Sequence, residues 1–193
     1  MPIIDGKVHH FSAGGLYNGL SLLIDDETHT YWDHITGEAV HGPLHGQQLD
    51  NWPITHTNVG EALANDLDIS VNVSSHRSLL SKILSWALWR RGKKQGFLPP
   101  HFQSTMTEPD ERLSKLELGL GVVDQGRAVY YPLADLTAGI DDEWVAGTLN
   151  ISRGDLGGSP VAIWKNSGER PFQLLSRWYG FAYTYPGCEI YKP

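Results

Sequence analysis

Short apolar segments separated by turn residues recur along the whole chain, and this pattern restricts the fold most. Most of them are rich in β-branched or aromatic residues, and Gly, Pro, Asn or Asp commonly lie between them, as is typical of strands. Strands joined by such short turns pair with their neighbours in an antiparallel sense. The sequence predicts an α+β fold, β-rich, with a mainly antiparallel sheet and two or so helices. The expected strands cover residues 20–24, 29–33, 38–41, 49–52, 68–73, 118–124, 127–131, 144–151, 161–165 and 178–185.

Two segments have the periodicity of helices. Thr57 to Asn65 begins at a capping residue and carries Glu61 in its first turn. Residues 78–89 place their apolar side chains on an arc of about 200°, which predicts a helix at about 78–91. Residues 92–110 contain paired lysines and prolines and are predicted to form a long loop or linker. We expect the 193 residues to form a single β-rich domain.

The segment 78–94 has two interpretations. Its wide apolar arc is followed by Arg90, Arg91, Lys93 and Lys94, so it is either buried against the sheet or docks on an anionic membrane surface or a protein. Membrane-surface helices carry a broad charged face, whereas this polar arc holds three serines and one lysine. The narrow polar arc favours burial, and a peripheral membrane or protein contact stays the alternative.

Charge is distributed in three blocks along the chain. Residues 1–75 carry −9, residues 76–101 carry +6 and residues 102–193 carry −4. Acidic flanks on both sides of a small basic block argue against a nucleic-acid partner. No apolar run approaches the roughly 20 residues that span a bilayer, and Met1 is not followed by a signal peptide. A cytoplasmic location is the default expectation, unless residues upstream of this sequence carry a signal.

The single cysteine limits redox chemistry. Cys188 cannot form an internal disulfide or a C-x-x-C pair, so any thiol exchange needs a partner thiol from outside the chain. Cys188 follows a Pro-Gly turn beside Glu189, which raises a thiol pKa and favours a buried structural role. Ser159 lacks the G-x-S-x-G motif, and no glycine run fits a nucleotide site. The sequence therefore indicates no catalytic residue and no particular cofactor, and leaves open whether the protein is an enzyme.

Histidines are concentrated near the N-terminus. Seven of the nine lie within the first 56 residues. Paired strands could bring His10, His29 and His34 together as ligands for zinc or copper. None of the tight metal-binding spacings is present, so ordinary surface or hydrogen-bonded histidines are the competing interpretation.

Residues 178–185 alternate between small or Trp residues and large aromatic ones. Read as a strand, Tyr179, Phe181, Tyr183 and Tyr185 would form one aromatic face. That face would be either a stacking platform for a planar ligand or a layer of the core, and the core is favoured.

Several of these stretches resemble the family known as domain of unknown function 3179. The similarity is carried by Gly14-Gly15-Leu16-Tyr17-Asn18-Gly19, by Tyr31 to Gly46 with its Thr-Gly-Glu-Ala and Gly-Pro-Leu-x-Gly patterns, by Pro132-Leu133, and by Arg177 to Phe181 with Tyr185-Pro186. Many similar members have Gln at the position of His34. Residues in or beside these stretches are candidates for a ligand pocket: Tyr17, Asn18, Trp32, Arg177, Trp178 and Tyr179.

The resemblance implies a missing N-terminal motif. Members of the family usually begin upstream with a strand and a Cys-containing motif, in which selenocysteine stands in some members. Ile3 to Val8 is similar to the segment directly after that motif, so the chain resembles a truncated member that opens within a hairpin. The expected function is the body of a thiol or selenol redox domain that lacks its reactive motif and is inactive as it stands. The alternative is a non-catalytic module that binds copper, zinc or a small ligand through its N-terminal histidines.

Overall fold

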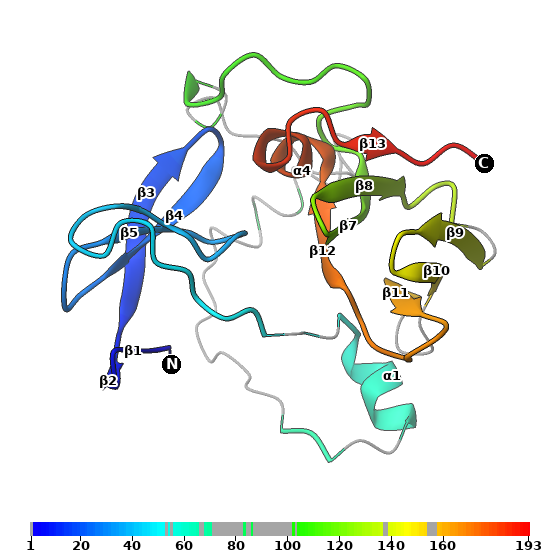
Figure 1. Ribbon diagram of the computed structural model, residues 1–193, viewed down its shortest axis with the longest axis horizontal. Helices are drawn as coiled ribbons and strands as arrows, with labels where there is room; N and C mark the ends of the chain where they lie inside the picture. Colours follow the sequence, from blue (N-terminus) through cyan, green and yellow to red (C-terminus); the bar gives the residue numbers. More distant parts are fainter. Residues whose placement is uncertain are drawn as a thin grey trace.

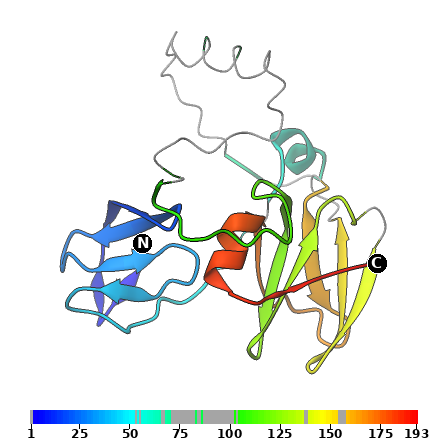
Figure 2. The same ribbon diagram turned by 90° about the horizontal axis from the view of Figure 1, so that it is seen from above.

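The computed structural model describes residues 2–52, 54, 56–65, 68–70, 83, 86, 102, 104–136, 139–153 and 158–193. Two bodies lie side by side in it (Figures 1 and 2): an N-terminal sheet, and a C-terminal body of two sheets and a helix. Their buried apolar residues fall into separate clusters. The prediction of a single domain stays a prediction.

The N-terminal sheet has the strand order β3-β4-β5-β6, all antiparallel. Its strands are β3 (Phe11–Tyr17), β4 (Leu20–Asp25), β5 (Tyr31–Asp33) and β6 (Ala39–His41). Trp32 and Ala39 are buried together with Ile4 in a small core. Residues 49–52, which we expected to form a strand, do not. The predicted strand 29–33 starts later, at Tyr31, because His29 has a positive φ of 58° and belongs to the turn.

Tight turns set the pairing of the hairpins. Strand β1 (Ile3–Ile4) pairs with β2 (Lys7–Val8), so Ile3-Ile4 has a strand partner within the chain. The intervening Asp5 and Gly6 have φ values of 49° and 75°, and Asn18 and Gly19, between β3 and β4, have 51° and 73°. Positive φ at both central positions is the signature of the hairpin turn that matches the twist of the strands.

The C-terminal body contains two sheets. One has the order β12-β7-β8-β13 and the other β11-β10-β9. A shared core of ten buried residues, including Leu120, Tyr131, Leu149 and Trp164, joins them. The predicted strand 144–151 is divided by a turn, because β9 ends at Trp144 and β10 begins at Gly147. The strands are β7 (Leu118–Asp124), β8 (Arg127–Pro132), β9 (Ile140–Trp144), β10 (Gly147–Arg153), β11 (Pro160–Trp164), β12 (Phe172–Arg177) and β13 (Glu189–Ile190).

The predicted strand 178–185 is wrong. Trp178–Thr184 forms helix α4, and the strand that precedes it, β12, was not predicted. Trp178, Phe181 and Ala182, at helical spacing, are buried, so the alternating aromatic face does not exist. Nearly every residue of this segment is either aromatic or small, so the sequence fits the two-residue period of a strand as well as the 3.6-residue period of a helix. Packing against the sheet selects the helix.

Two glycines make room for this helix. Gly119 and Gly121 lie on the same face of β7, opposite Leu120. A Cβ atom at position 121 would overlap the ring of Phe181, and one at 119 would overlap Tyr130. The glycines therefore let α4 approach the sheet closely, while Leu120 faces the shared core on the other side.

The predicted N-terminal helix is confirmed, as α1 (Val59–Ala64). Its cap is Asn58, whose Oδ1 accepts a hydrogen bond from the Glu61 amide at 3.0 Å. The predicted helix 78–91 and loop 92–110 lie mostly outside the described residues. Ile83 and Trp86 are helical and are 60% and 56% exposed, and Phe102 and Ser104 are also helical. Within the described part of the chain, no helix is long and apolar enough to cross a membrane.

Candidate functional site

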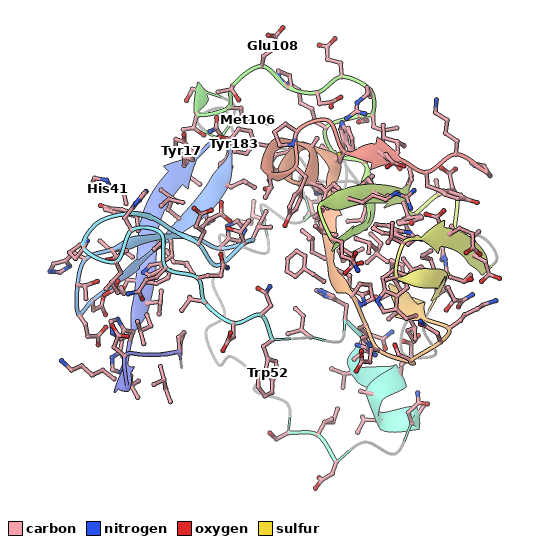
Figure 3. All side chains as sticks on the ribbon, in the orientation of Figure 1. Tyr17, His41, Trp52, Met106, Glu108 and Tyr183 are labelled. Carbon is pink, nitrogen blue, oxygen red and sulfur yellow. The ribbon has the colours of Figure 1, made fainter. Side chains whose placement is uncertain are left out.

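The turn between β3 and β4 joins the two bodies. Asn18, which is 5% exposed, hydrogen-bonds the Tyr183 hydroxyl of α4 through Nδ2, and its Oδ1 accepts from the Thr107 amide at 3.1 Å. The Gly19 amide donates to Thr105 Oγ1 at 3.1 Å. Figure 3 shows Tyr17 and Tyr183 close together here, with Met106 beside them. We call this contact between Asn18 and Gly19 on one side and Thr105, Thr107 and Tyr183 on the other the joint. It attaches the β3–β4 turn of the N-terminal sheet to the C-terminal body.

A cleft of about 1100 Å³ lies between the two bodies. Apolar side chains line both of its walls, and polar or charged side chains lie among them on each wall. Trp52, on the segment that leaves the N-terminal sheet, also lines the cleft and is 87% exposed (Figure 3). The N-terminal wall includes Leu23, Trp32, Asp33, His34, Ile35 and Leu49, and the C-terminal wall includes Arg153, Arg170, Phe172, Leu174, Arg177 and Tyr179.

The charges of the two walls differ in sign. Arg153, Arg170 and Arg177 line the C-terminal wall, whereas Asp33 and Asp50 line the N-terminal wall. Arg177 Nη1 donates to the Leu116 carbonyl at 2.6 Å and Arg153 Nε donates to the Leu136 carbonyl at 3.0 Å. These backbone contacts hold the two guanidinium groups on the wall of the C-terminal body.

The predicted pocket residues have different locations. Trp32, Arg177 and Tyr179 line the cleft although they are far apart in the sequence. Tyr17 and Asn18 lie at the joint instead. Trp178 is buried beneath α4, where its Nε1 donates to the Asp110 carbonyl at 2.9 Å. No sequence motif indicated Arg153 or Arg170, because only the folded sheets bring β10 and the segment between β11 and β12 to the same wall.

A buried carboxylate organises the N-terminal sheet away from the cleft. Asp25 has no exposed surface, and its Oδ2 accepts from Trp32 Nε1 at 2.9 Å and from the Thr30 amide at 3.2 Å. Its Oδ1 accepts from the Thr28 amide at 2.6 Å, and the Thr28 hydroxyl contacts both oxygens. Burial raises the pKa of Asp25, but the hydrogen bonds from Trp32 and Thr28 outweigh it and lower that pKa to about 2.

His9 lies beside this carboxylate, and the neighbouring His10 pairs with Glu27. His9 is 4% exposed, and its Nδ1 lies 3.3 Å from Asp25 Oδ1 and 3.9 Å from Glu27 Oε2. His10 is exposed, with its Nδ1 at 2.7 Å from Glu27 Oε1 and its amide donating to Oε2 at 2.9 Å. These hydrogen bonds from His10 lower the pKa of Glu27.

The three histidines predicted as metal ligands do not form a common cluster in the described residues. His10 pairs with Glu27, His29 lies exposed in the turn before β5, and His34 Nδ1 donates to the Ser21 carbonyl at 2.6 Å. The side chains that come within 4.8 Å of one another as a possible metal-binding group are those of His9, Asp25 and Glu27. The prediction of His10, His29 and His34 as ligands stays a prediction.

Cys188 is buried in the core between α4 and the sheet. Burial raises the pKa of its thiol, although Arg112, whose Nη2 lies 4.0 Å from Sγ, acts in the opposite direction. Arg112 also donates from Nη1 to the Cys188 carbonyl at 2.8 Å. The thiol is buried as we expected, but desolvation and not Glu189, which pairs with Arg127, raises its pKa.

The comparisons with known proteins give one match. The family described as "Protein of unknown function (DUF3179)" matches residues 2–78, which contain the whole N-terminal sheet and α1. No curated protein and no solved structure matches the chain. The match confirms the resemblance for the motifs within residues 2–78, and the motifs at residues 132–133 and 177–186 lie outside the matched range.

Proposed function

We propose that this chain, a member of the DUF3179 family through residues 2–78, is a binding module for a small organic anion with an apolar body. The ligand would lie in the cleft between the N-terminal sheet and the C-terminal body. The supporting observation is the cleft of about 1100 Å³, which both bodies line with apolar side chains and with polar and charged groups among them. Small-molecule sites commonly have this composition, are about 300–1,000 Å³ in volume, and lie between domains.

The charge of the C-terminal wall supports an anionic ligand. Three arginines line it, in a protein whose net charge is −7. Guanidinium groups bind carboxylate, sulfonate and phosphate through paired hydrogen bonds. Phe172 and Leu174 on the same wall, with Leu23 and Ile35 opposite, supply surface for an apolar body.

Two fluorescent probes test this proposal. Anilinonaphthalenesulfonate combines an apolar body with an anion, and phenylnaphthylamine is its uncharged counterpart. The folded protein at pH 7 should bind one equivalent of the sulfonate in a saturable manner and about tenfold more tightly than the amine, a difference of about 1.4 kcal/mol. Equal affinity for the two probes, or no saturable binding, would contradict the proposal.

A matched pair of variants locates the binding. Ile35→Glu places a carboxylate on the cleft wall and should weaken sulfonate binding about tenfold, again about 1.4 kcal/mol. Val40→Glu places the same charge on exposed β6 of the same sheet and should leave binding unchanged. If both variants bind like the parent protein, the sulfonate binds elsewhere and the proposed site is wrong.

The redox interpretation has no favouring observation among the described residues. The one cysteine of the chain is buried, and its pKa is raised. A thiol or selenol function would therefore depend on residues or partners outside this sequence, and it stays a prediction. The contact of segment 78–94 with a membrane or a protein also stays a prediction, since that segment lies almost entirely outside the described residues.

A further inference from the structure

One buried polar atom beside Asp25 has no hydrogen-bond partner in the described part of the chain. It is Nδ1 of His9, whose side chain is 5% exposed. Nδ1 faces Asp25 Oδ1 at 3.3 Å and Glu27 Oε2 at 3.9 Å without the alignment of a hydrogen bond. A buried ring nitrogen directed at two carboxylates is a position at which a bound cation would be stabilised.

We propose that His9, Asp25 and Glu27 bind one zinc-type divalent cation through Nδ1, Oδ1 and Oε2. In a tetrahedral zinc site with bonds of about 2.0–2.1 Å, neighbouring ligand atoms lie about 3.3–3.4 Å apart. The separation of His9 Nδ1 from Asp25 Oδ1, 3.3 Å, has this length. Glu27 Oε2 lies 3.9 Å from His9 Nδ1 and would have to move closer, which its partly exposed side chain on a turn allows.

The surroundings hold the ligand atoms in place. Trp32 and the Thr30 amide donate to Oδ2 of Asp25, and the Thr28 amide holds Oδ1, which lies 3.3 Å from His9 Nδ1. The hydrogen bonds from His10 similarly orient the Glu27 carboxylate. Metal ligands are usually fixed by such second contacts. The imidazole in this set favours a transition cation such as zinc over magnesium or calcium, which prefer oxygen ligands only.

A bound cation would stabilise the N-terminal sheet, which has the smaller apolar core. The apolar core of the N-terminal sheet consists of three buried residues, Ile4, Trp32 and Ala39. Small folds with so little core commonly depend on a metal or disulfide. The cation would link the segment before β3 to the end of β4 and the turn after it. This inference does not depend on the ligand cleft, which these three side chains do not line.

Calorimetry with the full chain tests the site. Protein purified without a His tag is treated with a chelator, dialysed and titrated with zinc chloride. We expect one zinc per chain, and a thermal midpoint that rises with zinc concentration because the metal binds the folded state. No binding heat together with an unchanged midpoint would overturn the proposal.

Three variants identify the ligands. Glu27→Gln should weaken zinc binding about 100-fold or more, because changes even to the contacts behind ligands cost about 10–100-fold. Asp26→Asn removes the same charge one residue away and should retain binding. The double variant His29→Asn/His34→Gln should also retain binding. Loss of binding in the double variant with retention in Glu27→Gln would overturn this site in favour of the one expected from sequence.

Circular dichroism verifies that each variant is folded. If Glu27→Gln does not fold, Glu27→Asp replaces it, since it keeps the charge but shortens the side chain. That variant should bind zinc at least about tenfold more weakly than the parent. Unchanged affinity in Glu27→Asp would overturn the role of Glu27.

Discussion

The N-terminal sheet and the C-terminal body are stabilised in different ways. The buried residues with polar or charged side chains in the described part of the chain are His9, Asn18, Asp25 and Thr30, and all belong to the N-terminal body. The C-terminal body instead has ten buried residues between its sheets and five more beneath α4, all apolar or aromatic. The first depends on buried hydrogen bonds around Asp25 and the second on close packing.

This difference predicts different vulnerabilities. A body with a small apolar core has a small free energy of unfolding. Each buried donor or acceptor without a partner therefore removes a large fraction of that free energy. A close-packed body tolerates polar changes at its surface but not added volume in its core. Resolved amide signals of β4 and β7, measured during denaturation, report on the two bodies separately.

Removal of the buried carboxylate should have the largest effect. Asp25→Ala leaves donors of Thr28, Thr30 and Trp32 without an acceptor and should destabilise the N-terminal sheet by about 4 kcal/mol. The signals of β7 should keep their midpoint. Asp26→Ala, next to it but exposed, should change stability by less than about 0.5 kcal/mol. A common loss in both bodies would contradict their separate stabilisation.

Added volume beneath α4 should affect the other body. Gly121→Ala brings a Cβ into the Phe181 ring and should cost about 3 kcal/mol in urea denaturation of the C-terminal body. The matched variant is Gly139→Ala, because the nearest atom to its added Cβ would be 3.8 Å away. If Gly121→Ala is as stable as Gly139→Ala, α4 does not pack on β7 as described.

Acid should act on the N-terminal sheet. The pKa of Asp25 is about 2 in the folded protein and 3.8 by its usual value, so the unfolded state binds more protons between these pH values. The stability that the Asp25 carboxylate contributes is therefore complete above pH 4, and it decreases by about 2 kcal/mol as the pH decreases to 2. Denaturation of chelator-treated protein at pH 5, 3 and 2 measures this loss. An equal loss in Asp25→Asn would assign it to other groups.

Alkali should act on the C-terminal body. Burial raises the pKa of Tyr185 to about 12 and raises those of Tyr130 and Tyr131 further. Unfolded tyrosine ionises near pH 10, so the stability that these neutral side chains contribute is present below pH 10 and decreases above it. Phenolate absorbance near 295 nm should rise together with the loss of β7 signals. Exposed tyrosines ionise near pH 10 in any case, so ionisation of Tyr130, Tyr131 and Tyr185 at about pH 10 without unfolding is the result that would contradict their burial.

A side-chain link between the two C-terminal sheets should have the smallest effect. Gln173 on β12 accepts from the Ala162 amide and donates to its carbonyl, both at 2.8 Å, so it pairs with β11 as a strand would. Gln173→Met should cost about 1–2 kcal/mol. Gln173→Glu retains only the acceptor and should be intermediate at pH 7. Equal stability of all three proteins would exclude this link.

The sequence predicted features that adjacent residues determine better than features that depend on contacts between distant residues. Turns such as Asp5-Gly6 and strands such as β7 follow from adjacent residues, and the cap of α1 was displaced by one residue only. Helix α4 was missed because its residues fit both periods, and burial against Gly121 selects between them.

The sites themselves depended on contacts between distant residues. Asp25 stands in the polar run Asp25-Asp26-Glu27-Thr28, where nothing in the sequence distinguishes a buried carboxylate from its exposed neighbours. Its acceptor role becomes visible only when β5 brings Trp32 to it. The arginines of the cleft wall come together from β10, β12 and the segment between β11 and β12.

Native-state hydrogen exchange tests the separate stabilisation of the two bodies most directly. Amides of β4 and β5 and those of β7 and β8 are followed in the same sample at increasing, sub-denaturing urea concentrations. We predict two opening free energies, the lower one for the N-terminal sheet, and zinc or Asp25→Ala should shift only that one. A single opening free energy common to all four strands, shifted equally by either change, would contradict the account.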